Sequence, residues 1–209
     1  RFGGPIPKQF QPLAGKPLVQ YVVERFLLTE AARVVVAIPE LLLTTIKQAP
    51  GDRVQFVAGG ETRLQSVINA MKAAGDGYDV VAVHDAVRPF FRIDTFARLI
   101  DVAREHGAAA PALPVTDTIH ATRDGRLTAT VDRSNLVAAQ TPQCFRFDVL
   151  RDSLARAERE KFDATDEAGL AAHFGYDVQI VPGDPFNIKI TRPEDLALAE
   201  AHFAEWSSE

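Results

Sequence analysis

The sequence has little that would tie the chain together covalently or hold it in a membrane. It contains one cysteine, Cys144, so no disulfide framework and no thiolate zinc cluster can form within it. No apolar run approaches the ~18 residues that span a bilayer, and no segment has the apolar core of a signal peptide. We therefore expect a cytoplasmic protein with a reduced thiol and no membrane partner.

The chain also has only a small excess of one sign of charge. The chain carries 23 Lys and Arg against 28 Asp and Glu, a net charge of −5. This balance argues against broad binding to nucleic acid or to anionic membranes. An anionic ligand would therefore need a local basic pocket. Apolar residues, by contrast, make up 46% of the 209 residues, enough for a core that needs no metal or disulfide.

Several familiar catalytic motifs are missing. The chain has no G-x-x-x-x-G-K-[ST] phosphate loop, no complete G-x-G-x-x-G, no G-x-S-x-G nucleophile elbow and no H-E-x-x-H. Its five histidines are scattered without the spacing of metal ligands. We therefore expect no zinc site.

Short β-branched runs alternate with helical periodicity in the first half of the chain. The pattern predicts strands over 33–38, 54–58 and 79–84, with helices from 17 to 28 and around 64–71 and 96–103. Strands that are almost continuously apolar and alternate with helices indicate a parallel sheet covered on both faces. Ligands then belong at the carboxyl ends of the strands.

The alternation breaks after Pro114. Residues 118–121 and 127–131 alternate apolar with polar side chains around Asp124-Gly125, a strong hairpin signal. An isolated hairpin is only marginally stable in water. We therefore expect a β-arm within 115–135 that packs on something else, a partner subunit being one candidate.

The rest of the chain returns to helices and strands. The predicted helices are 146–160 and 166–174, the predicted strands are 178–181 and 188–190, and a capping box from Thr191 to Glu194 opens a last helix to about Phe203. No repeat or linker divides the chain. The sequence thus predicts one α/β domain over 1–209: a mostly parallel, Rossmann-like sheet with helices on both faces and a protruding β-hairpin arm.

Small polar clusters fall at the predicted strand ends and turns, at 1–9, 59–66, 84–89, 130–133 with 140–143, and 187–191. The first combines Gly and Pro with two cations, so its backbone N–H groups and cations could approach a polyphosphate, or it is a frayed terminus. Ser66 lies opposite the apolar face of its helix. Its hydroxyl could reach a ligand there, or the residue could simply belong to the exposed surface of the helix.

Ionic groups stand at the ends of two predicted strands. Asp85 directly follows a buried strand, where a carboxylate can meet a ribose hydroxyl or a metal-bound phosphate, and Arg88 can meet an anion. The alternative is an Asp85–Arg88 pair that merely closes the turn. Lys189 interrupts an apolar strand, which is rare for a buried lysine without an anionic partner, although it could also reach solvent at a sheet edge.

Taken in order, these clusters resemble the 2-C-methyl-D-erythritol 4-phosphate cytidylyltransferase family over nearly the whole chain. The shared motifs are P-K-Q at 7–9, G-G-x-x-R-x-x-S-V at 59–67, V-H-D-A-V-R-P at 83–89, D-T at 117–118, V-D-R at 131–133, Q-T-P-Q at 140–143, T-D-E-A at 165–168 and N-I-K-I-T-R-P-E-D at 187–195. Each motif alone is unspecific, but their shared order is not.

The resemblance implies transfer of a cytidylyl group from CTP to a sugar-alcohol phosphate, with Mg²⁺ accompanying CTP. It implies three sets of residues: catalytic Arg1, Lys8 and Lys189; nucleotide-binding Gly3, Gly60, Glu61, Ser66, Asp85 and Ala86; and acceptor-binding Asp85, Arg88, Thr118, Arg133, Thr141 and Lys189. Asp85 is the one candidate for contact with the metal, which the protein alone is not expected to hold. In relatives the arm crosses to a second subunit, so a homodimer is expected in which Thr118 and Arg133 serve the partner's site.

The chain departs from the family pattern in two places. The family's N-terminal strand and Gly-rich turn are expected upstream of Arg1, and Glu61 stands where Asp is common, which leaves its role open. Three other functions remain as alternatives: a ribitol 5-phosphate cytidylyltransferase, a nucleotide-sugar glycosyltransferase, for whose metal no D-x-D is present, and a non-catalytic nucleotide-binding module.

Overall fold

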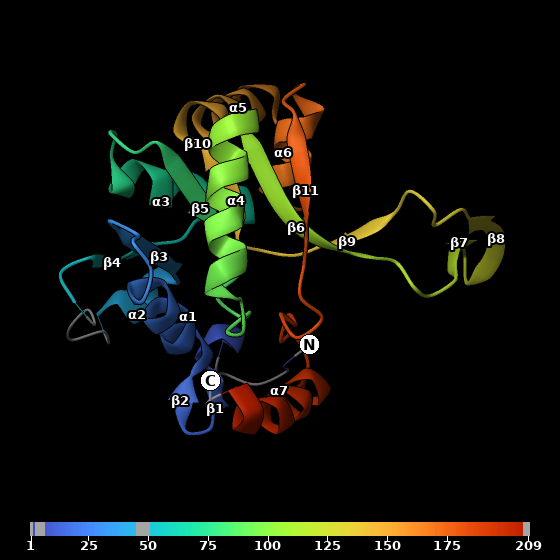
Figure 1. Ribbon diagram of the computed structural model, residues 1–209, viewed down its shortest axis with the longest axis horizontal. Coiled ribbons are helices and arrows are strands. Elements are labelled where there is room, and N and C mark those ends of the chain that lie inside the picture. Colours follow the sequence, from blue (N-terminus) through green and yellow to red (C-terminus); the bar gives the residue numbers. More distant parts are fainter. Residues whose placement is uncertain (1, 3–6, 45–50, 207–209) are drawn as a thin grey trace.

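The computed structural model describes residues 2, 7–44 and 51–206 (Figure 1). Its elements follow one another as η1 (Lys8–Phe10), β1 (Pro12–Leu13), β2 (Lys16–Pro17), α1 (Leu18–Leu27), β3 (Val34–Ile38), α2 (Glu40–Leu43), β4 (Val54–Ala58), α3 (Arg63–Ala74), β5 (Val80–Val83), α4 (Ile93–His106), β6 (Ala108–Pro114), β7 (Ile119–Arg123), β8 (Arg126–Val131), β9 (Val137–Ala139), β10 (Gln143–Arg146), α5 (Phe147–Glu160), α6 (Glu167–His173), β11 (Val178–Pro182) and α7 (Pro193–Trp206). None of the described helices is both long and apolar enough to cross a bilayer.

The largest sheet has the strand order β11-β6-β10-β5, and β9 also pairs with β6. β6 and β11 are parallel, whereas β10 lies antiparallel between β5 and β6. Strands β5, β6 and β11 therefore share one direction. β3 and β4 pair in parallel as a separate two-stranded sheet. The expected α/β fold with a mostly parallel sheet is confirmed, and the short strands β9 and β10 run against the common direction.

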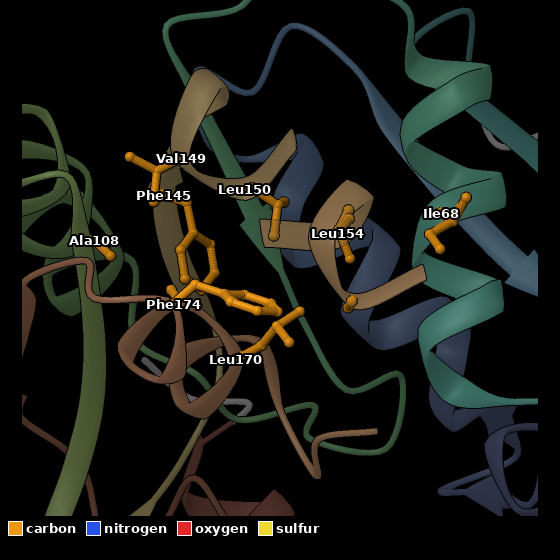
Figure 2. Close-up of a cluster of buried hydrophobic side chains, with 10 residues drawn as sticks. Ile68, Ala108, Phe145, Val149, Leu150, Leu154, Leu170 and Phe174 are labelled. Atoms are coloured by element: carbon orange, nitrogen blue, oxygen red, sulfur yellow. The ribbon is translucent and has the colours of Figure 1, made fainter. Parts of the chain in front are cut away.

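Helices cover both faces of the large sheet, as predicted. Successive strand residues point to opposite faces, so Phe145 and Ala108 pack in the cluster formed with α3, α5 and α6, whereas Cys144 and Ala109 pack in the cluster formed with α1 and α4. Figure 2 shows the first cluster, in which Phe145 faces helix side chains such as Leu150. Burial raises the pKa of the Cys144 thiol, so this cysteine packs as a small apolar residue and is not reactive.

The predicted arm is present as β7 and β8, which project from the body of the molecule (Figure 1). Asp124 and Gly125 have φ values of 51° and 74°, the positive angles that a type I′ turn requires. Ile119 lies opposite Val131, and further along the ladder a bulge interrupts the register. The turn residues seen in the sequence therefore set the geometry of the arm.

Strands β6, β9 and β10 were missed by the sequence reasoning. Alanine is depleted in strands, so Ala108, Ala109 and Ala110 followed by Pro111 gave no strand signal for β6. β9 and β10 are only three and four residues long. Their placement depends on pairing with β6 and β5, which are distant in sequence.

Two predictions near the C-terminal end are corrected. The predicted strand at 188–190 is irregular, and its backbone contact with the body is the bond from Ile190 N to Val87 O, 3.0 Å. The carboxylate that caps the last helix belongs to Asp195, one residue beyond the predicted Glu194; it accepts from the backbone N–H of Arg192 at 2.9 Å. The helix begins at Pro193, so Asp195 and not Glu194 is its third residue, the position from which a side chain reaches back to the cap.

Candidate active site

The site begins where β5 and β10 meet at the end of the sheet. Their register places Gln143 opposite Val83. Continuing this antiparallel register by two residues brings Thr141 beside Asp85. The backbone N–H of Asp85 donates to the Thr141 hydroxyl at 3.0 Å. The two motifs are distant in sequence, and they meet because β10 runs antiparallel to β5.

Asp85 is the central carboxylate of the site. Its Oδ2 lies 3.0 Å from Lys189 Nζ and 3.3 Å from Arg88 Nε. The Asp85 and Arg88 side chains are 14% and 10% exposed, whereas that of Lys189 is 42% exposed. Burial works to raise the pKa of Asp85, but the charges of Lys189 and Arg88 hold that pKa below its ordinary value. Two cations thus surround one ionised carboxylate and leave the cluster net positive.

Arg88 joins three segments of the chain. Beyond its ion pair, its Nη1 donates to Asn187 O at 2.7 Å and its Nη2 to Ala139 O at 3.4 Å. Asn187 in turn donates from Nδ2 to Thr141 O at 2.8 Å. The ion pair closes the turn after β5, as one interpretation of the sequence held. The further bonds fix the irregular segment that carries Lys189.

His84 is held by hydrogen bonds at both ring nitrogens. Its Nε2 lies 3.0 Å from Arg88 O, and a carbonyl oxygen can only accept, so Nε2 carries a proton. The ring packs edge-on against Phe26 and Phe91, and burial lowers its pKa to about 4. His84 is therefore neutral near pH 7. Its Nδ1 then has no proton and accepts from the Thr141 hydroxyl at 2.9 Å.

The Ser66 hydroxyl holds the glycine turn before α3. It accepts from Gly60 N at 3.0 Å and donates to Thr62 O at 3.0 Å. A Cβ on Gly60 would lie 2.1 Å from Gln65 Cγ, so any larger residue would displace that side chain. The predicted nucleotide-binding turn is thus formed, with the Ser66 proton committed inside it. Glu61 lies exposed in the same turn.

A cavity of about 210 Å³ lies between these segments. Its lining residues are Arg63, Asp85, Arg88, Ala139, Gln140, Thr141, Gln143, Thr165, Asp166 and Lys189. The predicted nucleotide-binding residues Gly60, Ser66 and Ala86 do not line it. A larger hollow of about 420 Å³ lies beside Tyr78 and Arg146, and none of the predicted site residues that the structure describes lines it. The smaller cavity is the candidate site because four of the six predicted acceptor-binding residues line it: Asp85, Arg88, Thr141 and Lys189.

Sequence reasoning missed several residues of this cavity. Arg63, at the start of α3, pairs with the buried carboxylate of Glu167 at 2.5 Å. Gln143 donates from Nε2 to Asp166 Oδ2 at 2.7 Å and accepts from Ala168 N at 2.9 Å. The signal was in the shared motifs at 59–67, 140–143 and 165–168. It could not be used because nothing local shows that these three motifs meet.

Other predicted residues lie apart from the cavity or outside the described part of the chain. Arg1 and Gly3 lie outside the described residues. Lys8 is exposed at the start of η1, and Thr118 and Arg133 are exposed in the arm, where a guanidinium nitrogen of Arg133 donates to Thr116 O. Within the described residues, none of these three lines the cavity.

The chemistry of the cavity fits phosphorylated substrates. Three cations, Arg63, Arg88 and Lys189, line it together with the carboxylates of Asp85 and Asp166, and its lining includes no cysteine or serine. Across residues 2, 7–44 and 51–206, no three His, Cys, Asp or Glu side chains gather as a metal site. Cations that converge at the carboxyl ends of strands stabilise phosphoryl oxygens. These features are those of an α/β transferase of the nucleotidyltransferase class.

Comparison with known proteins narrows this class. The family model "IspD: 2-C-methyl-D-erythritol 4-phosphate cytidylyltransferase" matches residues 1–205. The curated enzyme of that name from Geobacter metallireducens is 41% identical over 98% of this chain and 93% of its own, and that from Solibacter usitatus is 38% identical over 95% and 85%. The chain belongs to the 2-C-methyl-D-erythritol 4-phosphate cytidylyltransferase family.

Solved structures agree with this assignment. The enzyme of that name from Thermus thermophilus superposes with a TM-score of 0.83 at 37% identity, covering 94% of this chain and 93% of that one. The enzyme from Francisella tularensis gives a TM-score of 0.85 at 29% identity with the same coverage. The similarity therefore extends over nearly the whole fold.

The pKa of His84 predicts how stability depends on pH. The unfolded chain binds a proton at His84 near the ordinary pKa of 6.5, whereas the folded protein does so only near 4. As the pH falls from 7 to 4, this difference should lower the free energy of unfolding by up to about 3 kcal/mol. Urea unfolding at several pH values should show a shallower dependence in His84→Gln than in wild type. Equal slopes would mean that His84 does not titrate in this way.

Proposed function

We propose that this chain joins CTP to 2-C-methyl-D-erythritol 4-phosphate, giving 4-diphosphocytidyl-2-C-methyl-D-erythritol and pyrophosphate, in isoprenoid precursor synthesis by the non-mevalonate pathway. The relatives carry this activity in their names. Within the site, the strongest support for this proposal is the Lys189–Asp85–Arg88 cluster at the cavity. It is net positive, as a site for two phosphorylated substrates requires.

The reaction needs cations and positioning more than a general base. An oxygen of the acceptor phosphate attacks the α-phosphorus of CTP, and the bond from that phosphorus to the bridging oxygen breaks as pyrophosphate leaves. The acceptor phosphate is ionised at pH 7, so no proton has to be removed. Lys189 can approach the phosphates because its side chain is partly exposed, while Asp85 keeps its ammonium in place. Negative charge on nonbridging oxygens is then stabilised by fixed donors.

Lys8 and Arg1 are proposed to complete the cationic set at the triphosphate, on the strength of the P-K-Q motif and the family relationship. Gly3, Gly60, Glu61, Ser66, Asp85 and Ala86 are proposed for the nucleotide. Arg88 and Thr141 are proposed for the acceptor, together with Asp85 and Lys189.

Mg²⁺ is proposed to arrive with CTP. This ion typically binds through one or two carboxylates plus substrate phosphates. Asp85 fits this role, because both of its ion pairs use Oδ2 and leave Oδ1 as the oxygen that would bind the ion. When bound, the ion would neutralise charge on the triphosphate.

A cytoplasmic location also stays our prediction, and the free thiol of Cys144 is compatible with it.

The direct test is to incubate the protein with CTP, Mg²⁺ and 2-C-methyl-D-erythritol 4-phosphate and to follow pyrophosphate release. Turnover is expected, and it should stop when EDTA is added. Ribitol 5-phosphate is the competing acceptor, and it should react far more slowly. Faster turnover of ribitol 5-phosphate would reverse the assignment, and CTP binding without turnover of either acceptor would indicate a non-catalytic module.

The two lysines give a second prediction. Lys8→Ala and Lys189→Ala should each reduce kcat by ~10²-fold or more, since one oriented donor to a developing oxyanion typically contributes that much. Lys72→Ala, at an exposed position of α3, is the matched control and should retain full activity. Unfolding midpoints should stay close to wild type. Near-normal kcat in either site variant would remove that lysine from the mechanism.

A homodimer through the arm is also proposed. The arm and the segment beside it expose apolar side chains that a lone hairpin cannot cover, Leu127 at 60% and Val137 at 48% exposed. Two-fold closure is the commonest way for a soluble protein to bury such a surface against a second copy. Thr118 and Arg133 lie apart from the cavity of their own chain, which supports a role in the partner's site.

Subunit mixing tests this arrangement. Arg133→Ala and Lys8→Ala should each be inactive alone. In a mixed dimer, one of the two sites would contain both intact residues, so mixing should restore about a quarter of wild-type activity if subunits exchange at random in equal amounts. No recovery in verified mixed dimers would show that Arg133 acts within its own chain or only as a structural residue.

A further inference from the structure

We propose that His84 is a positioning residue that makes the Thr141 hydroxyl a hydrogen-bond acceptor only, so that Thr141 binds an alcohol group of the acceptor substrate and not its phosphate. This inference rests on the proposed function and adds to it the polarity of one contact. It follows from counting protons and lone pairs around Thr141.

A threonine hydroxyl has one proton and two lone pairs. The proton of Thr141 lies on the bond to His84 Nδ1, 2.9 Å long, because the one proton of the neutral ring, packed against Phe26 and Phe91, is on Nε2 and faces Arg88 O. One lone pair accepts the N–H of Asp85 at 3.0 Å. What remains for the cavity is a single lone pair.

The arrangement is fixed from behind by the other nitrogen of the ring. The proton of His84 Nε2 is committed to Arg88 O at 3.0 Å, and Arg88 N donates to Asp85 O at 3.0 Å. The imidazole therefore cannot change tautomer without breaking its bond to a carbonyl oxygen. Phe26 and Phe91 pack against the ring, so it also has little room to turn.

This polarity selects between the two ends of the acceptor. A phosphate dianion has only lone pairs, which would face the lone pair of Thr141 without a proton between them. A carbon-bound hydroxyl brings a proton and forms the bond. The phosphate belongs instead beside the cations of the same cavity, Arg63 and Lys189. Thr141 thus contributes to recognition of the sugar alcohol.

The test is a mutant cycle between the enzyme and the substrate. Wild type, Thr141→Ser and Thr141→Val are assayed with 2-C-methyl-D-erythritol 4-phosphate and with three analogues, each lacking one hydroxyl. We expect one analogue to lose about tenfold in kcat/KM with wild type and Thr141→Ser, the loss typical of one hydrogen bond. The same analogue should lose nothing further with Thr141→Val. Thr44→Val, an exposed threonine away from the cavity, is the control and should behave as wild type.

Two variants then separate the functions of His84. Asn places an acceptor near the position of Nδ1, so His84→Asn should preserve the coupling between Thr141 and the missing hydroxyl. Gln places its amide near the position of Nε2, so His84→Gln should lose that coupling while the KM for CTP changes little. If one variant fails to fold, the cycle on Thr141 alone still decides.

The outcomes separate this inference from the proposed function. Turnover by wild type with purely additive effects for all three analogues would overturn the inference and leave the function intact. A Thr141→Val defect that is equal for every analogue would have the same meaning, because it would place Thr141 at the phosphate. No turnover of the parent substrate by wild type would overturn the function and the inference together.

Discussion

The structure of the site depends on the contacts made by the buried guanidinium of Arg88. A charge held this far from water is tolerated only when it is paired and hydrogen-bonded. Arg88 meets this demand with the Asp85 carboxylate and with carbonyl oxygens of two other segments, at Ala139 and Asn187. Removing it would leave Asp85 with one exposed partner and would release the segment that carries Lys189.

That segment has no backbone strand pairing, so hydrogen bonds from side chains hold it in place. Besides Arg88, the buried amide of Gln140 forms two bonds to the backbone of Asp184, at 2.8 Å and 3.1 Å. Lys189 is therefore carried on an irregular stretch that is nevertheless fixed at several points. A fixed cation needs no reorganisation when negative charge develops, which is the condition for effective electrostatic stabilisation.

Several polar groups that could serve a ligand are used inside the protein instead. The Ser66 hydroxyl donates its proton to Thr62 O, and the Thr141 hydroxyl donates its proton to His84 Nδ1. A hydroxyl with its proton already committed can only accept from a ligand. The family motifs therefore combine two kinds of residue, those that line the cavity and those that orient them.

The sequence alone determined the alternation of helices and strands, the I′ turn at Asp124-Gly125 and the location of the polar clusters, because each depends on neighbours within a few residues. The strand β10, the ion pair from Lys189 to Asp85 and the pair from Arg63 to Glu167 were decided only by the tertiary structure. Their partners are distant in sequence, so local propensity could not bring them together. Hydrogen-bond register places β10 beside β5, side-chain hydrogen bonds hold the segment that carries Lys189, and the ion pair from Arg63 to Glu167 joins α3 to α6. Local pattern showed which residues could do chemistry, and these long-range contacts decided which of them meet.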